Sequence, residues 1–270
     1  MKLRWTQALR KIVPKAWRRW LGRRLYGVVY SGDFHSWGEA RAASEGYDAG
    51  VILDRTVVAA RAVRAGQGQW ERDTVVFHAP AVHAPLLAAL RRAAAMNDGR
   101  LVVMDFGGSL GSTWWQHRRW LEDLKEVRWS VVEQPGMVAA GQREFSAGPL
   151  RFYETIAGCV AAERPDVALL SSVLPYLESP HRVLREIAGG GFRHLIIDRT
   201  GFVPVGRDRL TVQRVPAEIY PASYPCWFFD RTALLKPFER DWRVVAEWPG
   251  FDRADIDATF SGLALERIAP

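Results

Sequence analysis

Apolar residues recur along this chain with two different periods, which divide it into an N-terminal and a C-terminal region. In the N-terminal region the spacing is helical, and residues 51–67 and 84–96 each predict an amphipathic helix. Ser36 is a good N-cap for a further short helix, and the segment TVVF at 74–77 predicts a short strand. We therefore expect a helical cap region over residues 27–98.

From Leu101 onwards, apolar runs of strand length alternate with segments of helical length. This alternation predicts an α/β fold, a Rossmann-like three-layer sandwich in which right-handed crossovers connect a mostly parallel sheet. Residues 242–248 and 263–268 predict an antiparallel pair at the end of the chain. The other predicted strands are 101–106, 127–134, 150–156, 166–172 and 192–198, and the predicted helices are 112–124, 135–145 and 179–188.

The length and cysteine content restrict the class of protein. A chain of 270 residues can form one α/β domain with extensions or two small domains. The two cysteines, Cys159 and Cys226, lie far apart and have no metal-binding spacing, so we expect no disulfide framework, no metal site and a reducing compartment such as the cytoplasm. No run of 18 apolar residues occurs, so we expect no transmembrane helix.

The net charge of +7 is concentrated at the N-terminus. Nine of the 37 Lys and Arg residues lie in residues 1–24, and the other 28 are outnumbered by 30 Asp and Glu residues. A near-neutral body argues against nucleic-acid binding. The basic arm, residues 1–26, contains three tryptophans and is not a secretory signal. It predicts either an amphipathic helix on an anionic membrane, which gives a peripheral location at the inner face of the cell membrane, or a helix docked on its own domain.

The segment LVVMDFGGSLGSTWWQ, residues 101–116, joins a buried strand to a helix through a glycine-rich turn. Asp105 closes the strand, and Gly107, Gly108 and Gly111 form the turn. Such a turn lets the backbone approach a ligand, and the free N–H groups at the helix start favour an anionic group. A tight turn that binds nothing explains the same residues.

Acidic and hydroxyl side chains follow the next three predicted strands. Glu133 ends the second strand, Glu154 follows the third, and Ser171 and Ser172 end the fourth. The carboxyl ends of parallel strands lie at one edge of the sheet, where ligands bind at a topological switch point. A carboxylate at the position of Glu133 can accept hydrogen bonds from both hydroxyls of a ribose. Together with the glycine turn, this predicts a site for a nucleoside-containing cofactor.

The order DFGGSLGS, VVEQ, RPDVALLSSVLPYLESPHRVLREIA and HLIIDRT resembles the class I S-adenosylmethionine-dependent methyltransferases over about residues 100–200. More narrowly, YSGDFHSWGEA, GGSLGSTWWQ, VVEQPGMV and LTVQRVPAEIYPASYPCWFF resemble a bacterial family of methyltransferase-like proteins associated with surface-polysaccharide biosynthesis. This second resemblance covers nearly everything after the basic arm.

The resemblance implies a seven-stranded sheet in a methyltransferase domain over residues 99–270, with S-adenosylmethionine as cofactor. By position, Asp105 and the loop 107–111 face the methionine part, Glu133 the ribose and Glu154 the adenine edge, while Ser171 and Ser172 belong to the same site. Ser109 departs from the family pattern because it stands where the middle glycine is expected.

Methyl transfer needs alignment of the reactants, and it needs a base when the acceptor is a hydroxyl or a protonated amine. Asp198 and Tyr176 are the candidate catalytic groups, because they follow the fifth and fourth predicted strands. Asp198 capping a turn and Tyr176 packing in the core are the alternatives. His78 and His83 flank Pro80 and could reach the pocket from the cap, without the spacing of a metal pair.

An aromatic insertion at about residues 203–229 is the predicted substrate side. Tyr220, Tyr224 and Trp227 could line a pocket for a sugar, or could form a lid that buries the sheet edge. The leading hypothesis is a methyltransferase that acts on a sugar or glycan precursor. The alternatives are a non-catalytic Rossmann-like cofactor-binding protein and a nucleotide-sugar-modifying enzyme, for which no Tyr-x-x-x-Lys pair is visible.

Overall fold

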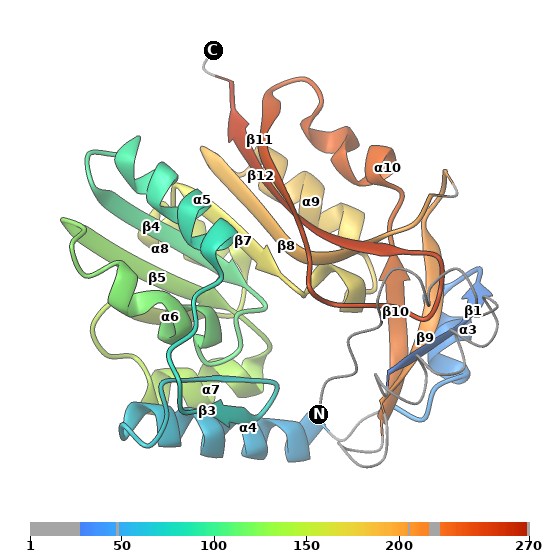
Figure 1. The fold of residues 1–270 in the computed structure, drawn as a ribbon, viewed down its shortest axis with the longest axis horizontal. Coiled ribbons are helices and arrows are strands. Elements are labelled where there is room, and N and C mark those ends of the chain that lie inside the picture. The colour runs from blue at the N-terminus through green and yellow to red at the C-terminus, as the bar shows by residue number, and fades with distance from the viewer. Residues whose placement is uncertain (1–27, 47–48, 205, 216–221, 269–270) are drawn as a thin grey trace, which may run out of the picture.

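A computed structural model describes residues 28–46, 49–204, 206–215 and 222–268 of the chain. The basic arm, residues 1–26, lies outside these ranges, and so does Tyr220. The described chain forms a large central sheet between two layers of helices, with a smaller sheet beside it (Figure 1).

The large sheet has seven strands in the order β11-β12-β8-β7-β4-β5-β6, which confirms the predicted fold class. Strands β8, β7, β4, β5 and β6 are parallel, whereas β12 and β11 are antiparallel to their neighbours. The predicted antiparallel pair at the end of the chain is therefore confirmed. The strands are β4 (Arg100–Phe106), β5 (Glu126–Val132), β6 (Leu150–Tyr153), β7 (Val167–Ser171), β8 (His194–Phe202), β11 (Trp242–Pro249) and β12 (Thr259–Arg267).

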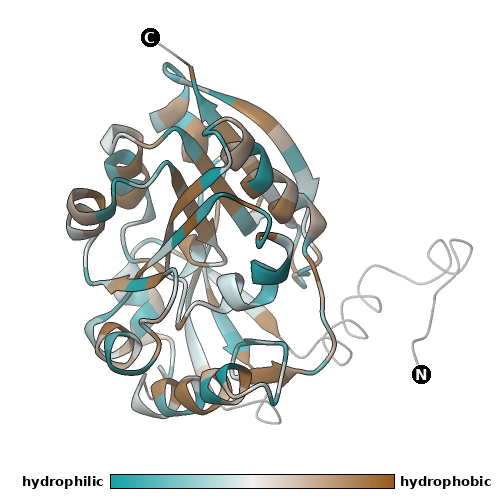
Figure 2. Cartoon of the chain, turned by 90° about the vertical axis from the view of Figure 1, so that its left-hand side faces the viewer, coloured by the Kyte–Doolittle hydropathy of each residue, from teal (hydrophilic) through white to brown (hydrophobic). Residues whose placement is uncertain are grey.

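Apolar residues on both faces of the parallel strands explain the two helical layers. Figure 2 shows hydrophobic stretches, in brown, along strands of the sheet. Val103 and Leu169 belong to the core on one face, and Met104 and Leu170 belong to the core on the other. The first face is covered by α4 (Ala49–Arg64), α5 (Ala84–Ala95), α6 (Ser112–His117) and α7 (Pro135–Glu144). The second face is covered by α8 (Ile156–Glu163), α9 (Pro180–Gly189), α10 (Arg231–Leu235) and the 3₁₀ turn η3 (Lys236–Phe238).

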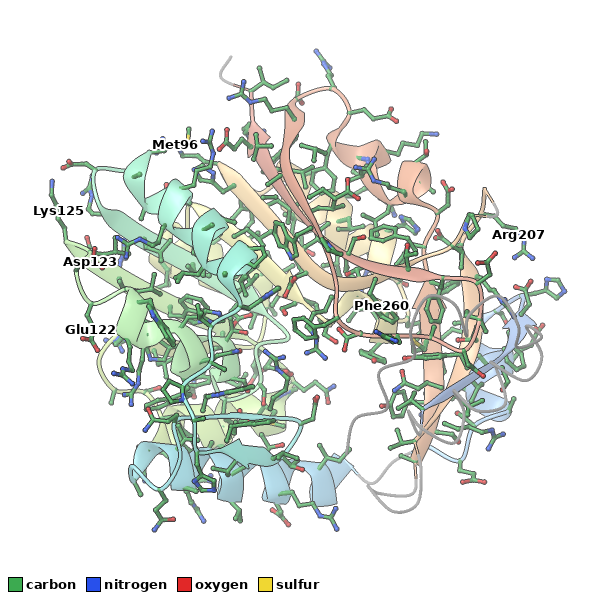
Figure 3. The ribbon with its side chains drawn as sticks, viewed as in Figure 1. Met96, Glu122, Asp123, Lys125, Arg207 and Phe260 are labelled. Carbon is green, nitrogen blue, oxygen red and sulfur yellow. The ribbon has the colours of Figure 1, made fainter. Side chains whose placement is uncertain are left out.

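A small antiparallel sheet joins distant parts of the chain in the order β1-β9-β10. Its strands are β1 (Val29–Phe34), β9 (Arg209–Val215) and β10 (Ala222–Phe228), and α3 (Trp37–Ala42) packs on one of its faces. The other face packs on the start of β12, where the ring of Phe260 lies 5.9 Å from that of Phe228. Figure 3 shows Phe260 between the two sheets and Arg207 at the outer end of the small sheet.

A hairpin of β2 (Trp70–Arg72) and β3 (Val75–Phe77) packs against α6. The Ser112 hydroxyl donates a hydrogen bond to Glu71, and the Arg72 guanidinium donates one to Gln116 Oε1 at 2.6 Å. These contacts attach the region before the parallel sheet to the helix that follows the glycine turn.

Most predicted elements are confirmed, including the Ser36 N-cap, whose hydroxyl accepts from the Glu39 N–H. The helix predicted over 112–124 is wrong in length, because α6 ends at His117 and a 3₁₀ turn, η1 (Arg118–Trp120), follows it. The described residues between 28 and 98 contain three strands besides their helices, and only the one at 74–77 was predicted. The division into domains stays a prediction.

Candidate functional site

The order of the strands reverses between β4 and β7. The chain runs from β4 to β5 and β6 on one side, and then from β7 to β8 on the other. The pairing register places Asp105, Ser171 and Asp198 on the same face of the sheet. Asp105 and Ser171 lie near the carboxyl ends of β4 and β7. Asp198, which was predicted to end its strand, lies in the middle of β8, because this strand continues to Phe202. Glu133 follows β5 at the same edge. The sequence-predicted residues therefore meet at a topological switch point, where ligands bind in open α/β sheets.

The glycine turn is packed closely against its surroundings. Gly107 and Gly111 have φ angles of 73° and 88°, which favour glycine. A Cβ at Gly107 would lie 2.3 Å from Val173 Cγ2, and a Cβ at Gly108 would lie 2.5 Å from Asp105 Cγ. The protein's own packing thus requires glycine at both positions, and any substitution at Gly108 also disturbs the Asp105 carboxyl.

Asp105 is the most deeply buried of the predicted cofactor residues, with 1% of its surface exposed. Its carboxyl accepts a hydrogen bond from Trp129 Nε1 at 2.9 Å. Burial raises the pKa of Asp105 to about 7; the Trp129 hydrogen bond opposes this rise, and the nearby Glu133 charge adds to it. A buried carboxyl with so few hydrogen bonds can accept further ones from a cationic or N–H-bearing group.

Glu133 connects its own strand to the glycine turn. Its Oε1 accepts from the Ser109 N–H at 3.2 Å, and its Oε2 accepts from the Gln134 N–H at 2.8 Å. Burial raises the pKa of Glu133, and these two hydrogen bonds limit the rise. Each carboxylate oxygen retains a further lone pair, so the side chain can still accept from ligand hydroxyls.

Ser109 has a φ angle of 56°, in the left-handed region that disfavours residues other than glycine. The departure from the expected glycine pattern therefore carries a backbone cost. Glu154 is exposed and directly follows β6, next to the strand that ends before Glu133.

Ser171, Ser172 and Asp198 form one hydrogen-bonded group. The Ser171 hydroxyl donates to Asp198 Oδ2 at 3.3 Å, and the Ser172 N–H donates to the Asp198 carbonyl at 3.0 Å. Asp198 Oδ1 accepts from Trp248 Nε1 at 2.9 Å and lies 3.1 Å from His83 Nε2. Ser171 thus contacts the candidate catalytic carboxylate, whereas Ser172 contacts only the backbone of Asp198.

The hairpin adds charged residues above this edge of the sheet. Glu71 is 1% exposed, and burial raises its pKa to about 7, against the effect of the Ser112 hydrogen bond. Arg72 stacks on the Trp70 ring at 5.1 Å, and burial together with the charge of Arg199 lowers the pKa of its guanidinium. Arg199 itself forms two hydrogen bonds with Asp252, at 2.8 and 3.0 Å.

The predicted aromatic segment divides between the two faces of the small sheet. Tyr224 accepts a hydrogen bond from Gln213, and Gln213 Oε1 accepts one from the Tyr176 hydroxyl, both at 3.1 Å. Trp227 stacks on Trp37 of α3 and donates to the Leu177 carbonyl. Tyr224 therefore lies with the second candidate catalytic residue, whereas Trp227 stabilises the contact with α3.

Tyr176 as a whole residue is 38% exposed, but its hydroxyl is buried, and this burial raises the pKa of the hydroxyl well above its usual value. This hydroxyl is therefore better suited to donate a hydrogen bond than to lose its proton.

Sequence reasoning did not find Glu71, Arg72 or His117. The hairpin that carries Glu71 and Arg72 is short, and only one of its strands has a recognisable apolar run. His117 lies inside a predicted helix, and nothing in the sequence indicates that it contacts the loop before α5.

The described residues contain neither a metal-binding cluster nor a membrane-spanning helix. No group of three or more His, Cys, Asp or Glu side chains among them is arranged to hold a metal ion. No helix within the same residues has the length and apolar character that would cross a membrane.

No protein-family model matches the sequence, and no curated protein matches it significantly. Several solved structures resemble its fold. The N-terminal domain of EvdMO1, in the presence of SAH and D-fucose, is 13% identical, with a TM-score of 0.46, over 81% of this chain and 98% of that one.

Magnesium protoporphyrin IX methyltransferase from Synechocystis PCC 6803, with bound SAM, is 15% identical, with a TM-score of 0.45, over 83% of this chain and 99% of that one. The cyclase SpnF is 13% identical, with a TM-score of 0.47, over 82% and 96%. Scores and identities this low do not decide an activity, which therefore has to follow from the geometry of the site.

Proposed function

We propose that this chain is an S-adenosylmethionine-dependent methyltransferase that acts on a sugar or glycan precursor in surface-polysaccharide biosynthesis. The observation that carries the proposal is a pair of carboxyls, those of the buried Asp105 and the half-buried Glu133, beside the glycine turn at the switch point of the sheet. Burial raises the pKa of both groups, so each gains from a ligand that donates hydrogen bonds to it.

The residues of this edge fit the chemistry of the cofactor. Glu133 has lone pairs left for the two hydroxyls of a ribose, and Asp105 can accept from the amino group of the methionine part. Glu154, next along the same edge, is the candidate for the adenine. When bound, S-adenosylmethionine supplies an electrophilic methyl group on a sulfonium, and the protein's main tasks are to align the acceptor and exclude water.

The small sheet supports a substrate role for the aromatic insertion. The segments YSGDF, LTVQRV and ASYPCWFF carry the resemblance to the polysaccharide-associated family, and they form the three neighbouring strands β1, β9 and β10. Tyr224 and Gln213 lie on the face of this sheet that meets Tyr176. Aromatic rings beside hydrogen-bonding groups are suited to a sugar face.

A non-catalytic cofactor-binding protein is the second candidate. The observation in its favour is the Ser109 N–H, which donates to Glu133. This contact closes the turn onto the carboxylate and explains part of the site without a ligand.

Calorimetry of the purified full chain with S-adenosylmethionine, S-adenosylhomocysteine and NAD tests the proposal. We expect binding of the two sulfur nucleosides and none of NAD. Glu133→Gln preserves the shape of the side chain, and we expect it to weaken S-adenosylhomocysteine about 5- to 150-fold, or about 1–3 kcal/mol. The exposed Glu122, labelled in Figure 3, provides the control Glu122→Gln, which should bind as wild type.

Failure of the wild type to bind either sulfur nucleoside would refute the proposal. Binding without methyl transfer to any sugar acceptor would favour the non-catalytic candidate.

A further inference from the structure

His83 and Asp198 form a buried pair beside the carboxyl end of β7, where Asp198 lies level with Ser171. Asp198 is 1% exposed and the His83 side chain 9%, and His83 Nε2 lies 3.1 Å from Asp198 Oδ1. Trp248 Nε1 and the Ser171 hydroxyl donate to the two oxygens of the same carboxylate. Burial alone would raise the pKa of Asp198, but the hydrogen bond and charge of His83, with Trp248 and Arg199, lower it.

This geometry assigns the proton on the His83 ring. An ionised carboxylate only accepts hydrogen bonds, so Nε2 carries a hydrogen. In the neutral form of the ring, Nδ1 then carries a lone pair. Within the described part of the chain, Nδ1 has no hydrogen-bond partner. This nitrogen is therefore free to accept a proton.

The backbone of His83 is fixed by His117. The His83 N–H donates to His117 Nε2 at 3.2 Å, and His117 Nδ1 donates to the Thr113 carbonyl at 2.9 Å. Burial lowers the pKa of His117 to about 4, so it stays neutral and keeps both bonds. Because Thr113 and His117 belong to α6, this connection ties His83 to the helix that follows the glycine turn.

Aromatic rings restrict the His83 side chain further. It meets Phe251 edge-on at 5.1 Å and Trp248 at 6.3 Å. The charged groups around the pair are Arg199 with its partner Asp252, and Arg72, whose charge also acts on His117.

We propose that His83 is the catalytic general base that takes the proton from a hydroxyl of the methyl acceptor, and that Asp198 is its positioning residue. The inference rests on the proposed function and specifies its acceptor as a hydroxyl compound and its product as a methyl ether. A carboxylate acceptor would need no base, whereas an alcohol has to lose its proton as it attacks.

Proton transfer to His83 and methyl transfer to the acceptor oxygen occur in one step. The acceptor O–H bond breaks and its proton moves to His83 Nδ1, while the oxygen forms a bond to the methyl carbon and the carbon–sulfur bond breaks. The sulfonium becomes a neutral thioether, and the imidazolium is stabilised by the ionised Asp198. Asp198, whose oxygens already accept three hydrogen bonds, does not take the proton itself.

Histidine side-chain NMR of the ¹⁵N-labelled full chain tests the pair without an acceptor. Among the six histidines, His83→Gln identifies the resonance. We expect the Nε2–H tautomer in the wild type, and a change in the chemical shifts of the His83 ring nitrogens in Asp198→Asn, because the ionised carboxylate that fixes the tautomer has gone. The exposed His78 provides the matched control, since His78→Gln should leave His83 unchanged.

Activity and cofactor binding provide the second readout. We expect His83→Gln to bind S-adenosylhomocysteine as tightly as wild type. With UDP-glucose, glucose 1-phosphate and methyl glucoside as hydroxyl probes, kcat for any that is methylated should fall about 100-fold or more with little change in KM. The pH limb for the base should disappear.

An Nδ1–H tautomer in the wild type, His83 ring-nitrogen shifts unaffected by Asp198→Asn, or full activity in His83→Gln would overturn the assignment. If the wild type does not bind S-adenosylhomocysteine, the proposed function is overturned instead. The NMR result would still test the pairing of His83 with Asp198. If Asp198→Asn does not fold, Trp248→Phe removes one donor to the carboxylate and provides the second variant.

Discussion

Asp105→Asn should change the dependence of stability on pH. Asparagine has nearly the same shape and can still accept from Trp129, but it does not titrate. In the wild type, the pKa of Asp105 is about 7 in the folded protein and 3.8 in the unfolded chain. Between these values the folded state holds the proton more tightly, so stability from this group is complete below pH 3.8 and is lost as pH rises to 7.

The magnitude follows from the difference of about three pKa units. Each unit corresponds to about 1.4 kcal/mol, so the loss amounts to about 4 kcal/mol at most. Glu71, with a pKa of about 7, acts in the same direction. His117, with a pKa of about 4, acts in the opposite direction, because the stability that it contributes to the fold rises as pH increases from 4 to 6.5. The difference between variant and wild type isolates Asp105.

Urea unfolding from pH 4.5 to 8 at constant ionic strength, followed by circular dichroism, measures this difference. We expect similar stability at pH 4.5 and a more stable Asp105→Asn protein at pH 8. Glu122→Gln is the exposed control, and it should show no such trend. A variant that differs from wild type by the same amount at every pH, or that is less stable at pH 8, would refute the burial argument. The variant should also bind S-adenosylhomocysteine more weakly, since the buried carboxyl is the proposed ligand contact.

Three further predictions concern the turn and the arm. Ser109→Gly should raise the free energy of unfolding by up to about 1 kcal/mol, because it relieves a left-handed backbone, and unchanged or lower stability would contradict this. Gly108→Ala should lower the free energy of unfolding by about 1–3 kcal/mol, since the Cβ would clash with Asp105. Gly189→Ala is the control and should change this free energy little, because there is open space around Gly189. The full chain should sediment with anionic vesicles at low salt, and a chain beginning at Tyr26 should not, because the nine basic residues of the arm lie before Tyr26. Equal sedimentation of the two chains would contradict a membrane role for the arm.

The parallel core could be predicted because its signals are local. The apolar run before Asp105 is a buried strand, and Glu133 and Ser171 follow their strands at the same edge because parallel strands share a direction. The position of each side chain at the edge then follows from the fold class.

Contacts between distant segments could not be predicted in this way. His83 meets Asp198 across 115 positions of the sequence, and no local pattern pairs the two. Strand β1 pairs with β9 although one begins at Val29 and the other ends at Val215. One missed feature had a local signal: Tyr224 and Trp227 are three positions apart, so in a strand they point to opposite faces.

The small sheet has a consequence for the order in which the protein folds. Strand β1 can pair only after β9 has been made, nearly the length of a whole domain later, whereas the strands β4 to β8 need only neighbours within their own stretch of chain. Long-range pairing is slow because loop closure costs entropy before contacts repay it. The five parallel strands of the large sheet can therefore pair during synthesis, before β12 and β11 complete it. We expect the sheet that carries Gln213 and Tyr224 to be a separate cooperative unit that can open alone. Amide exchange should accordingly be faster in β1 than in β4.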